Sequence, residues 1–157
     1  MQIRPVKRAD IPQIARLYYE TVHRVNARDY GPEQIRAWAP RVYPEAHWQR
    51  RFRRYRVLVA EEEGKVVGFV ELGRTGEIDC FYVHHGHQHR GIGAALVAWV
   101  EREARAQGNT RLLADVSITA EPFFRRMGFN VMRRQIKIYR NRAFKQAVME
   151  KRLRRAG

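Results

Sequence analysis

The sequence predicts an α+β fold with a mixed, mostly antiparallel sheet flanked by helices. Apolar residues recur at helical spacing in the first third of the chain, whereas β-branched runs separated by turn signals begin at residue 56. A long apolar-faced helix then separates two predicted strands. A strand–helix–strand connection of this length is a crossover, which implies one parallel pair of strands among hairpins.

The first third of the chain predicts one strand and three helices. Residues 1–7 are expected to form a short strand. Asp10 is a good N-cap for the next helix, and Pro12 stands in its first turn, where a missing N–H costs nothing. Shorter helices are expected in residues 30–40 and 44–55. The first helix buries a stripe of apolar side chains: Ile11, Ile14, Leu17, Tyr18, Val22 and Val25.

From residue 56 onward, the spacing of apolar residues changes from that of helices to that of strands. Two β-branched runs in residues 56–73 are joined across Glu63–Gly64, which predicts a hairpin. The remaining elements are expected in this order: a strand at 76–83, a helix from Gly91 to Gln107 ended by Gly108–Asn109, a strand at 111–117, a short helix opened by Thr119 and closed by Gly128, and two strands at 129–139 and 144–153 around Asn141.

Length and composition favour one domain in a reducing compartment. A chain of 157 residues buries about two thirds of its unfolded surface, so we expect a single domain over residues 1–157. No apolar run approaches the ~20 residues of a membrane span, and the N-terminus lacks the apolar region of a secretory signal. The single Cys80 forbids an internal disulfide. These features predict a cytoplasmic protein without a membrane partner.

The net charge is the unusual feature of the composition. The chain carries 31 Lys and Arg against 16 Asp and Glu, a formal charge of +15. The positive electrostatic field of such a protein attracts polyanions, whether a nucleic acid, the ribosome, an acidic protein or a phosphate-bearing cofactor. The net charge alone does not distinguish among these partners. The arginines are spread over many segments, as on solvated faces. A nucleic-acid or ribosome-associated module is the alternative function.

The segment YVHHGHQHRGIGAALVAWVE, residues 82–101, places a glycine-containing loop between a strand and a helix. Glycines let successive N–H groups point into one concavity, and the helix N-terminus adds about half a positive charge there. The loop Gln88–Ala94 therefore predicts an anion site that fits a pyrophosphate. It is not a Walker loop, because no Gly-Lys-Ser/Thr follows.

The same loop contains four histidines, at positions 84, 85, 87 and 89. Imidazoles at alternate positions can bind zinc. Gly86 interrupts the segment, however, and neither an acidic residue nor a thiolate lies within it. We expect no metal, and interpret the histidines as loop residues or as weak donors to a bound anion.

The segment IDCFYVHHGHQHRGIGAALVAWVE resembles the central motif of the GNAT superfamily of acetyl-CoA-dependent N-acetyltransferases, V-x-P-x-x-Q/R-x-x-G-x-G/A. Val83, Gln88, Gly91 and Gly93 match it, and His85 stands where proline is usual. DVSITAEPFFRRMGFNV resembles the second motif of the family, and VMEKRL is similar to its closing strand. The likeness covers nearly the whole chain, and YGPEQIRAWA together with the second motif is also similar to a group of small bacterial acetyltransferases.

The resemblance implies a GNAT-like sheet whose fourth and fifth strands splay into a V. The pantetheine arm of acetyl-CoA, the co-substrate, would lie there like an extra strand, and the loop amides would hold the pyrophosphate. The acceptor would be an amine of a small molecule or a protein, attacking directly in a ternary complex. A homodimer through the late strands is expected. The implied cofactor-binding residues are Phe81, Tyr82, Val83, Gln88, His89, Arg90, Gly91, Ile92, Gly93, Ala94, Ser117 and Phe124.

Transfer to an amine requires a base for the amine proton and a donor for the departing thiolate. Asp79 and Glu71 are the candidate bases, on adjacent predicted strands at the mouth of the cleft, with Glu77 a weaker third. A backbone N–H near Val83 would polarise the thioester carbonyl.

The proton donor departs from the family pattern. The tyrosine common four residues before Gly128 is replaced by Phe124, and the frequent asparagine by Ser117. Tyr82 and Tyr139 are the substitute proton donors. Cys80 is expected to be a core residue, since no activating histidine stands at a fixed spacing from it.

Overall fold

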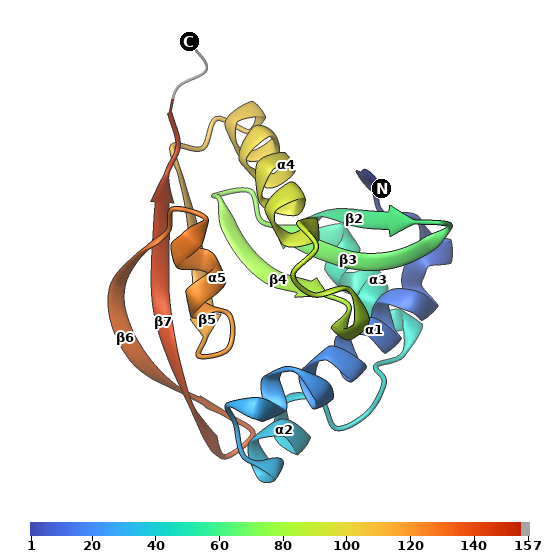
Figure 1. Cartoon of the computed structure of the whole chain (residues 1–157), viewed down its shortest axis with the longest axis vertical. Coiled ribbons are helices and arrows are strands. Elements are labelled where there is room, and N and C mark those ends of the chain that lie inside the picture. Colours follow the sequence, from blue (N-terminus) through green and yellow to red (C-terminus); the bar gives the residue numbers. More distant parts are fainter. Residues whose placement is uncertain (155–157) are drawn as a thin grey trace.

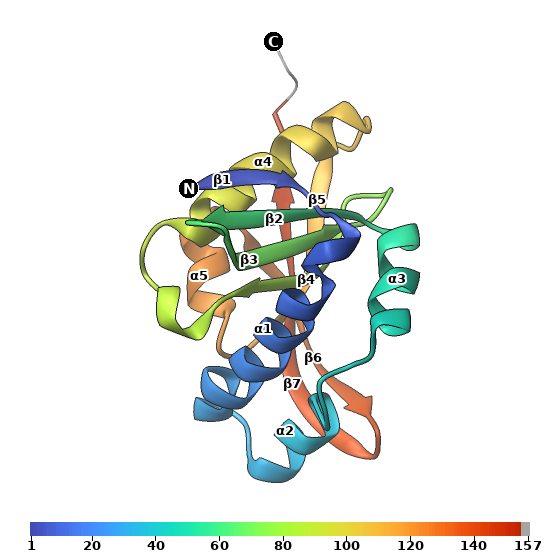
Figure 2. The same ribbon diagram turned by 90° about the vertical axis from the view of Figure 1, so that its right-hand side faces the viewer.

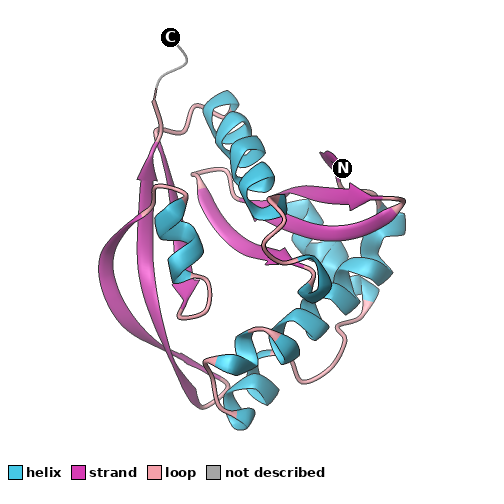
Figure 3. Cartoon of the chain, in the orientation of Figure 1, coloured by secondary structure: helices cyan, strands magenta, loops and turns pink. Residues whose placement is uncertain are grey.

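The computed structural model describes residues 1–154 and contains one seven-stranded sheet, in the order β1-β2-β3-β4-β5-β7-β6 (Figures 1 and 3). All neighbouring strands are antiparallel except β4 and β5. The strands are β1 (Gln2–Pro5), β2 (Arg56–Glu62), β3 (Lys65–Leu72), β4 (Glu77–Val83), β5 (Arg111–Ser117), β6 (Asn130–Tyr139) and β7 (Arg142–Arg152). The predicted mixed, mostly antiparallel sheet is confirmed.

Helices cover both faces of the sheet (Figure 2). α4 and α5 pack on one face around Leu96, Val100 and Phe124, whereas α1 and α3 pack on the other around Leu17 and Trp48. α2 joins α1 and the β6–β7 hairpin in a smaller cluster. The helices are α1 (Ile11–Arg24), α2 (Pro32–Trp38), α3 (Glu45–Arg54), α4 (Ile92–Ala106) and α5 (Glu121–Arg126).

Local signals place these elements well, and one of the two predicted caps is wrong. Asp10 is the N-cap residue of α1 as predicted, but its carboxylate makes no capping hydrogen bond; it accepts hydrogen bonds from Arg4 and from the backbone N–H of Lys7, at 2.7–2.9 Å. The N-cap of α5 is Ala120, not Thr119, and the N–H of Ala120 donates to Ser117 Oγ at 3.2 Å. At Asp10, an ion pair with Arg4 takes the carboxylate that the sequence pattern assigns to the cap.

β4 and β5 separate soon after they meet. Their parallel pairing is limited to Glu77 with Leu113 and Ile78 with Ala114, although both strands continue for several residues. A β-bulge in β4 coincides with this point, because the register with β3 shifts by one residue after Ile78. Bulges increase the local twist and end regular pairing. The splayed pair implied by the family resemblance is therefore present, and β4 leaves backbone groups unpaired on the β5 side.

No helix within residues 1–154 combines the length and apolar character that crossing a bilayer requires. The edge strand β6 exposes Met132, Ile136 and Ile138 by 57–68%. These side chains lie on the strand that the predicted dimer would use, and the dimer stays a prediction.

Candidate active site

A cavity of about 1390 Å³ opens where β4 and β5 separate. Walls come from β4, the loop before α4, β5, α5, the N-terminal helices and the β6–β7 hairpin. Every residue predicted to bind the cofactor lines this cavity, from Phe81–Val83 and Gln88–Ala94 to Ser117 and Phe124. The structure thus brings together two motifs that are distant in the sequence.

The loop before α4 has the backbone of an anion cradle. His89 has φ 58° and Gly91 has φ 83°, both in the left-handed region, and Gly91 is the N-cap of α4. Left-handed residues in a loop can direct successive N–H groups into one concavity, where the helix N-terminus adds positive potential. A Cβ on Gly91 would meet no atom within 4 Å, so the space in front of it is open. These features fit a pyrophosphate.

Gln88 supports the loop from within. Its Nε2 donates to the carbonyl oxygen of Val83 at 2.6 Å, and a longer contact of 3.4 Å reaches the carbonyl oxygen of His84. The side chain thereby ties the start of the cradle to the end of β4. The Gln88 position of the motif therefore has a structural role in this chain: the side-chain amide fixes the loop relative to β4.

Gly93 is required by a close aromatic neighbour. A Cβ at this position would lie 2.8 Å from two ring atoms of Phe123, whose ring also packs against Phe81 and Phe124. Contacts that short force the ring or the helix to move, and overpacking costs about 1–3 kcal/mol. Replacing glycine by alanine within a helix returns at most about 1 kcal/mol.

Gly93→Ala should therefore lower the free energy of unfolding by about 1 kcal/mol, measured by urea denaturation. The same change made in a Phe123→Leu background removes the ring that the methyl group meets and should be neutral or stabilising. An equal loss in both backgrounds would show that the ring contact is not the cause.

Ser117 and Phe124 close the other side of the cavity. Besides receiving the N–H of Ala120, Ser117 ends β5 at the splay. Phe124 is only 3% exposed and packs edge-on against Phe81 and Phe129. Phe124 is thus a core residue that presents part of its ring to the cavity, and its side chain carries no proton to donate.

The two predicted bases, Glu71 and Asp79, differ sharply in how far their carboxylates are exposed. Glu71 is 0% exposed and is held by Arg51, whose Nε contacts both carboxylate oxygens at 2.9 Å and whose Nη2 lies 2.6 Å from Oε1. The expectation that Glu71 stands at the mouth of the cleft is wrong. Asp79 is 46% exposed, lines the cavity and also pairs with Arg51. Only Asp79 of the two presents a carboxylate to the cavity.

The bulge in β4 explains this arrangement. Glu71 alone stands opposite two residues of β4, Asp79 and Cys80, because Val70 pairs with Phe81 and Leu72 with Ile78, so β4 has one extra residue here. Arg51 reaches all three, with Nη2 3.7 Å from the sulfur of Cys80. The sequence could not single out Arg51, since it is one of several arginines in WQRRFRRYR.

Cys80 is buried, as predicted for a core residue. Desolvation raises the pKa of its thiol well above the ordinary value, with the Glu71 carboxylate adding to the shift. A thiol that stays protonated is a poor nucleophile.

Tyr82 belongs to an aromatic wall between β4 and α1. Its ring stacks on Phe69 at 5.9 Å between centroids and meets Tyr18 edge-on at 4.9 Å. Burial raises the pKa of Tyr82 well above its ordinary value. The phenol therefore stays protonated at neutral pH and lines the same cavity as Asp79.

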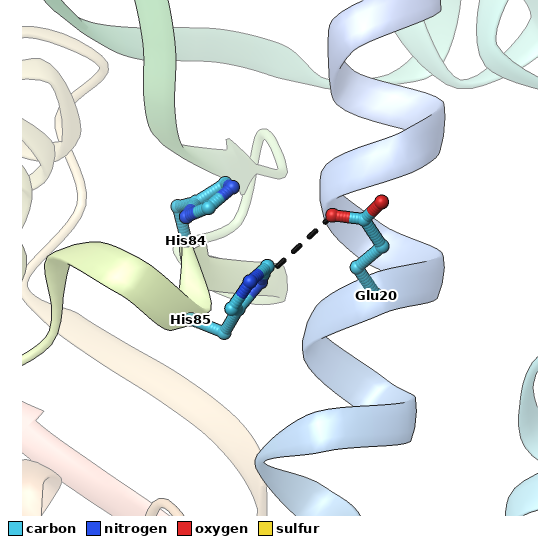
Figure 4. A group of neighbouring side chains, drawn as sticks. All are labelled: Glu20, His84 and His85. Carbon is cyan, nitrogen blue, oxygen red and sulfur yellow. Dashed lines mark ion pairs between the residues drawn. The ribbon is translucent and has the colours of Figure 1, made fainter.

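The histidines brace the loop against α1. His84 Nδ1 accepts the N–H of Gly86 at 2.9 Å, and burial lowers the pKa of His84. His85 Nδ1 faces Glu20 of α1 across 3.8 Å, too far for a hydrogen bond (Figure 4). Glu20, His84 and His85 bring their ligand atoms within 4.8 Å of one another. This acidic neighbour comes from a distant helix, so no local spacing in the sequence could have shown it.

Comparison with known proteins agrees with this geometry. The family model of the acetyltransferase (GNAT) domain matches residues 26–153. The uncharacterized N-acetyltransferase YafP of Escherichia coli K12 is 30% identical over 135 residues, covering 86% of this chain and 85% of YafP.

Solved structures share the fold along the whole chain. A GCN5-related N-acetyltransferase from Rhodopseudomonas palustris superposes with a TM-score of 0.91 at 30% identity, covering 97% of this chain and 95% of that one. The structure of yncA from Salmonella typhimurium with its cofactor acetyl-CoA has a TM-score of 0.74 at 24% identity, covering 100% and 96%. The chain belongs to the GNAT family of acetyltransferases and is an acyltransferase.

Proposed function

We propose that this chain is an N-acetyltransferase that takes acetyl-CoA as co-substrate and a primary amine as acceptor, with direct attack in a ternary complex. One observation carries the proposal: a single cavity joins the unpaired edge of β4, the loop Gln88–Ala94 and the accessible carboxylate of Asp79. A single domain over residues 1–157 and a cytoplasmic location complete the proposal as predictions.

In this proposal, backbone groups make most of the contacts with acetyl-CoA, the acetyl donor. The edge of β4 from Phe81 to Val83 would pair with the pantetheine amides as a strand pairs with its neighbour. The N–H groups from His89 to Ala94 would hold the pyrophosphate at the N-terminus of α4. The structure of yncA, which has this fold, contains its cofactor acetyl-CoA and so supports acetyl-CoA as the co-substrate. Bound acetyl-CoA supplies an acetyl thioester, and this chain's residues position it and manage the protons.

Asp79 is the proposed base. Its carboxylate is open to the cavity, while the opposite side is held by Arg51, which fixes its orientation. It would accept a proton from the acceptor ammonium, directly or through a water, so that the nitrogen lone pair is free. Glu71 is the proposed positioning residue: it holds Arg51 from the buried side and stabilises the bulge that carries Asp79.

Tyr82 is the proposed proton donor for the departing thiolate, in place of the tyrosine that Phe124 replaces. Tyr82→Phe should lower kcat about tenfold, as expected for one lost hydrogen bond to a charged group, and leave the ring packing on Phe69 intact. Steady-state kinetics checks this. Full turnover in a stably folded Tyr82→Phe variant would remove Tyr82 from the mechanism.

The function is tested by thiol release from acetyl-CoA with a panel of primary amines, with the acetylated product confirmed by mass spectrometry. Acetylation of at least one amine, dependent on both substrates, is expected. A folded protein that binds acetyl-CoA but acetylates no amine in the panel would contradict the proposal. The nucleic-acid alternative keeps only the net charge of +15 as support. It requires steeply salt-dependent binding to RNA or DNA in a gel shift.

A further inference from the structure

The strands β5, β7 and β6 present one face to the cavity opposite β4. Directly paired residues of antiparallel strands point to the same side. The register pairs Ser117 with Gln146 and Gln146 with Gln135, so these three share a face. In the neighbouring row on the same face, Val148 is paired with Asp115 on one side and with Arg133 on the other. In the row beyond Gln146, Phe144 is paired with Lys137. We call this the acceptor face: Asp115, Ser117, Phe144, Gln146, Val148, Arg133, Gln135 and Lys137.

The acceptor face is separate from the phosphate cradle. The opposite face of the same strands carries Ala114, Val116, Ala147 and Met149, which pack in the core cluster of α4 and α5. The loop Gln88–Ala94 leads into α4 on that side. Phe144 of the acceptor face instead packs against Tyr30 and Trp38, next to α2. Cations on the acceptor face are therefore placed away from the proposed pyrophosphate site.

Arg133 and Lys137 are cations of the acceptor face that line the cavity. Both are exposed, and neither forms an ion pair with a carboxylate of residues 1–154. Their neighbour Arg134, on the other face of β6, pairs with Glu121 at 2.8 Å. Arg134 thus has an acidic partner on its face of β6, whereas Arg133 and Lys137 form no ion pair within residues 1–154, although Asp115 also lies on the acceptor face.

The cavity as a whole carries an excess of positive charge. Its lining contains seven cations, Arg28, Arg51, Arg54, Arg90, Arg126, Arg133 and Lys137, against four carboxylates, Asp29, Glu77, Asp79 and Asp115. On the β4 side Arg51 is shared between Asp79 and the buried Glu71, so one positive charge faces two carboxylates there. The unpaired positive charge on the β6 side would attract an anionic group of a ligand that enters between the two walls.

We propose that the acceptor is a small amine that also carries a carboxylate, as an amino acid does, and that Lys137, assisted by Arg133, binds this carboxylate. The inference rests on the proposed N-acetyltransferase function. Asp79 on the β4 wall faces the ammonium end, while the cations of β6 face the acid end. Opposite charges on opposite walls orient a zwitterion so that its nitrogen points toward the thioester.

The test compares matched substrates that differ only in the carboxylate: phenylalanine with phenethylamine, leucine with isoamylamine, and histidine with histamine. The wild-type enzyme should show a higher kcat/KM for the amino acid of the pair it uses. Lys137→Gln should raise KM for the amino acid about tenfold, with kcat and the KM for acetyl-CoA little changed. It should leave the decarboxylated amine unaffected. Arg133→Gln should act in the same direction.

Lys145→Gln is the matched control, because Lys145 pairs with Ile136 on the other face of the hairpin and does not line the cavity. It changes the net charge equally and should leave both substrates unaffected. An equal effect of Lys137→Gln on both members of a pair, or an equal effect of Lys145→Gln, would overturn the inference. So would faster turnover of the decarboxylated amines. Absence of acetylation with every amine tested would instead overturn the proposed function itself.

Discussion

Gly91→Glu is expected to weaken acetyl-CoA binding by at least about 100-fold. The glutamate side chain would project into the open space in front of the cradle, where the N–H groups converge. Its negative charge would compete with the pyrophosphate for the same donors. Loss of charge-assisted hydrogen bonds worth about 3 kcal/mol corresponds to about 100-fold in affinity. Isothermal titration calorimetry with acetyl-CoA measures the change directly.

Gly64→Glu separates this effect from backbone strain. Gly64, at the tip of the β2–β3 hairpin, has φ 78° and an equally open Cβ position. A left-handed conformation costs a non-glycine residue about 1–2 kcal/mol at either site. Both variants should therefore lose similar thermal stability, while only Gly91→Glu loses acetyl-CoA binding. Unchanged affinity in Gly91→Glu would contradict the assignment of Gln88–Ala94 as the phosphate cradle.

Asp79→Asn should reduce kcat by about 100-fold or more, the range observed when a general base is removed. The amide keeps the shape of the side chain but cannot take the amine proton at neutral pH. Affinity for acetyl-CoA should stay the same, because the proposed cradle and the Phe81–Val83 edge are untouched. Raising the pH should recover part of the rate with a weakly basic acceptor, since more of it is then already neutral. Measurement of kcat across pH, with calorimetry for acetyl-CoA, checks both points.

Glu45→Gln is a suitable control for this variant. It makes the same carboxylate-to-amide change in an exposed ion pair with Arg8, far from the cavity lining. Turnover should be unchanged. If Asp79→Asn turned over at the wild-type rate, Asp79 would not be the base. Because Asp79 also pairs with Arg51, urea denaturation should accompany the kinetics, so that turnover is compared only between folded proteins.

Most of the sheet could be predicted because its signals are local. The Glu63–Gly64 turn adopts positive φ at both residues, as a tight hairpin requires, and the glycine loop stands between β4 and α4 as the motif indicates. The prediction of Glu71 at the mouth of the cleft failed because a distant partner, Arg51 of α3, holds its carboxylate. Asp10 is the N-cap residue as predicted, but Arg4 of β1 and the backbone N–H of Lys7 take its carboxylate, so the side chain does not cap α1.

By itself, the sequence determined the order of elements, the glycine-containing loop before α4 and the family, because hydrophobic periodicity, glycine positions and motif spacing are properties of short segments. The tertiary structure alone decided which carboxylate is accessible, because the β4 bulge puts Glu71 opposite Asp79 and Cys80 and brings Arg51 from another element to all three. The tertiary structure also decided which cations of β6 line the cavity. Strand register selects alternate residues for each face, so Arg133 and Lys137 line the cavity while Arg134 turns away to Glu121.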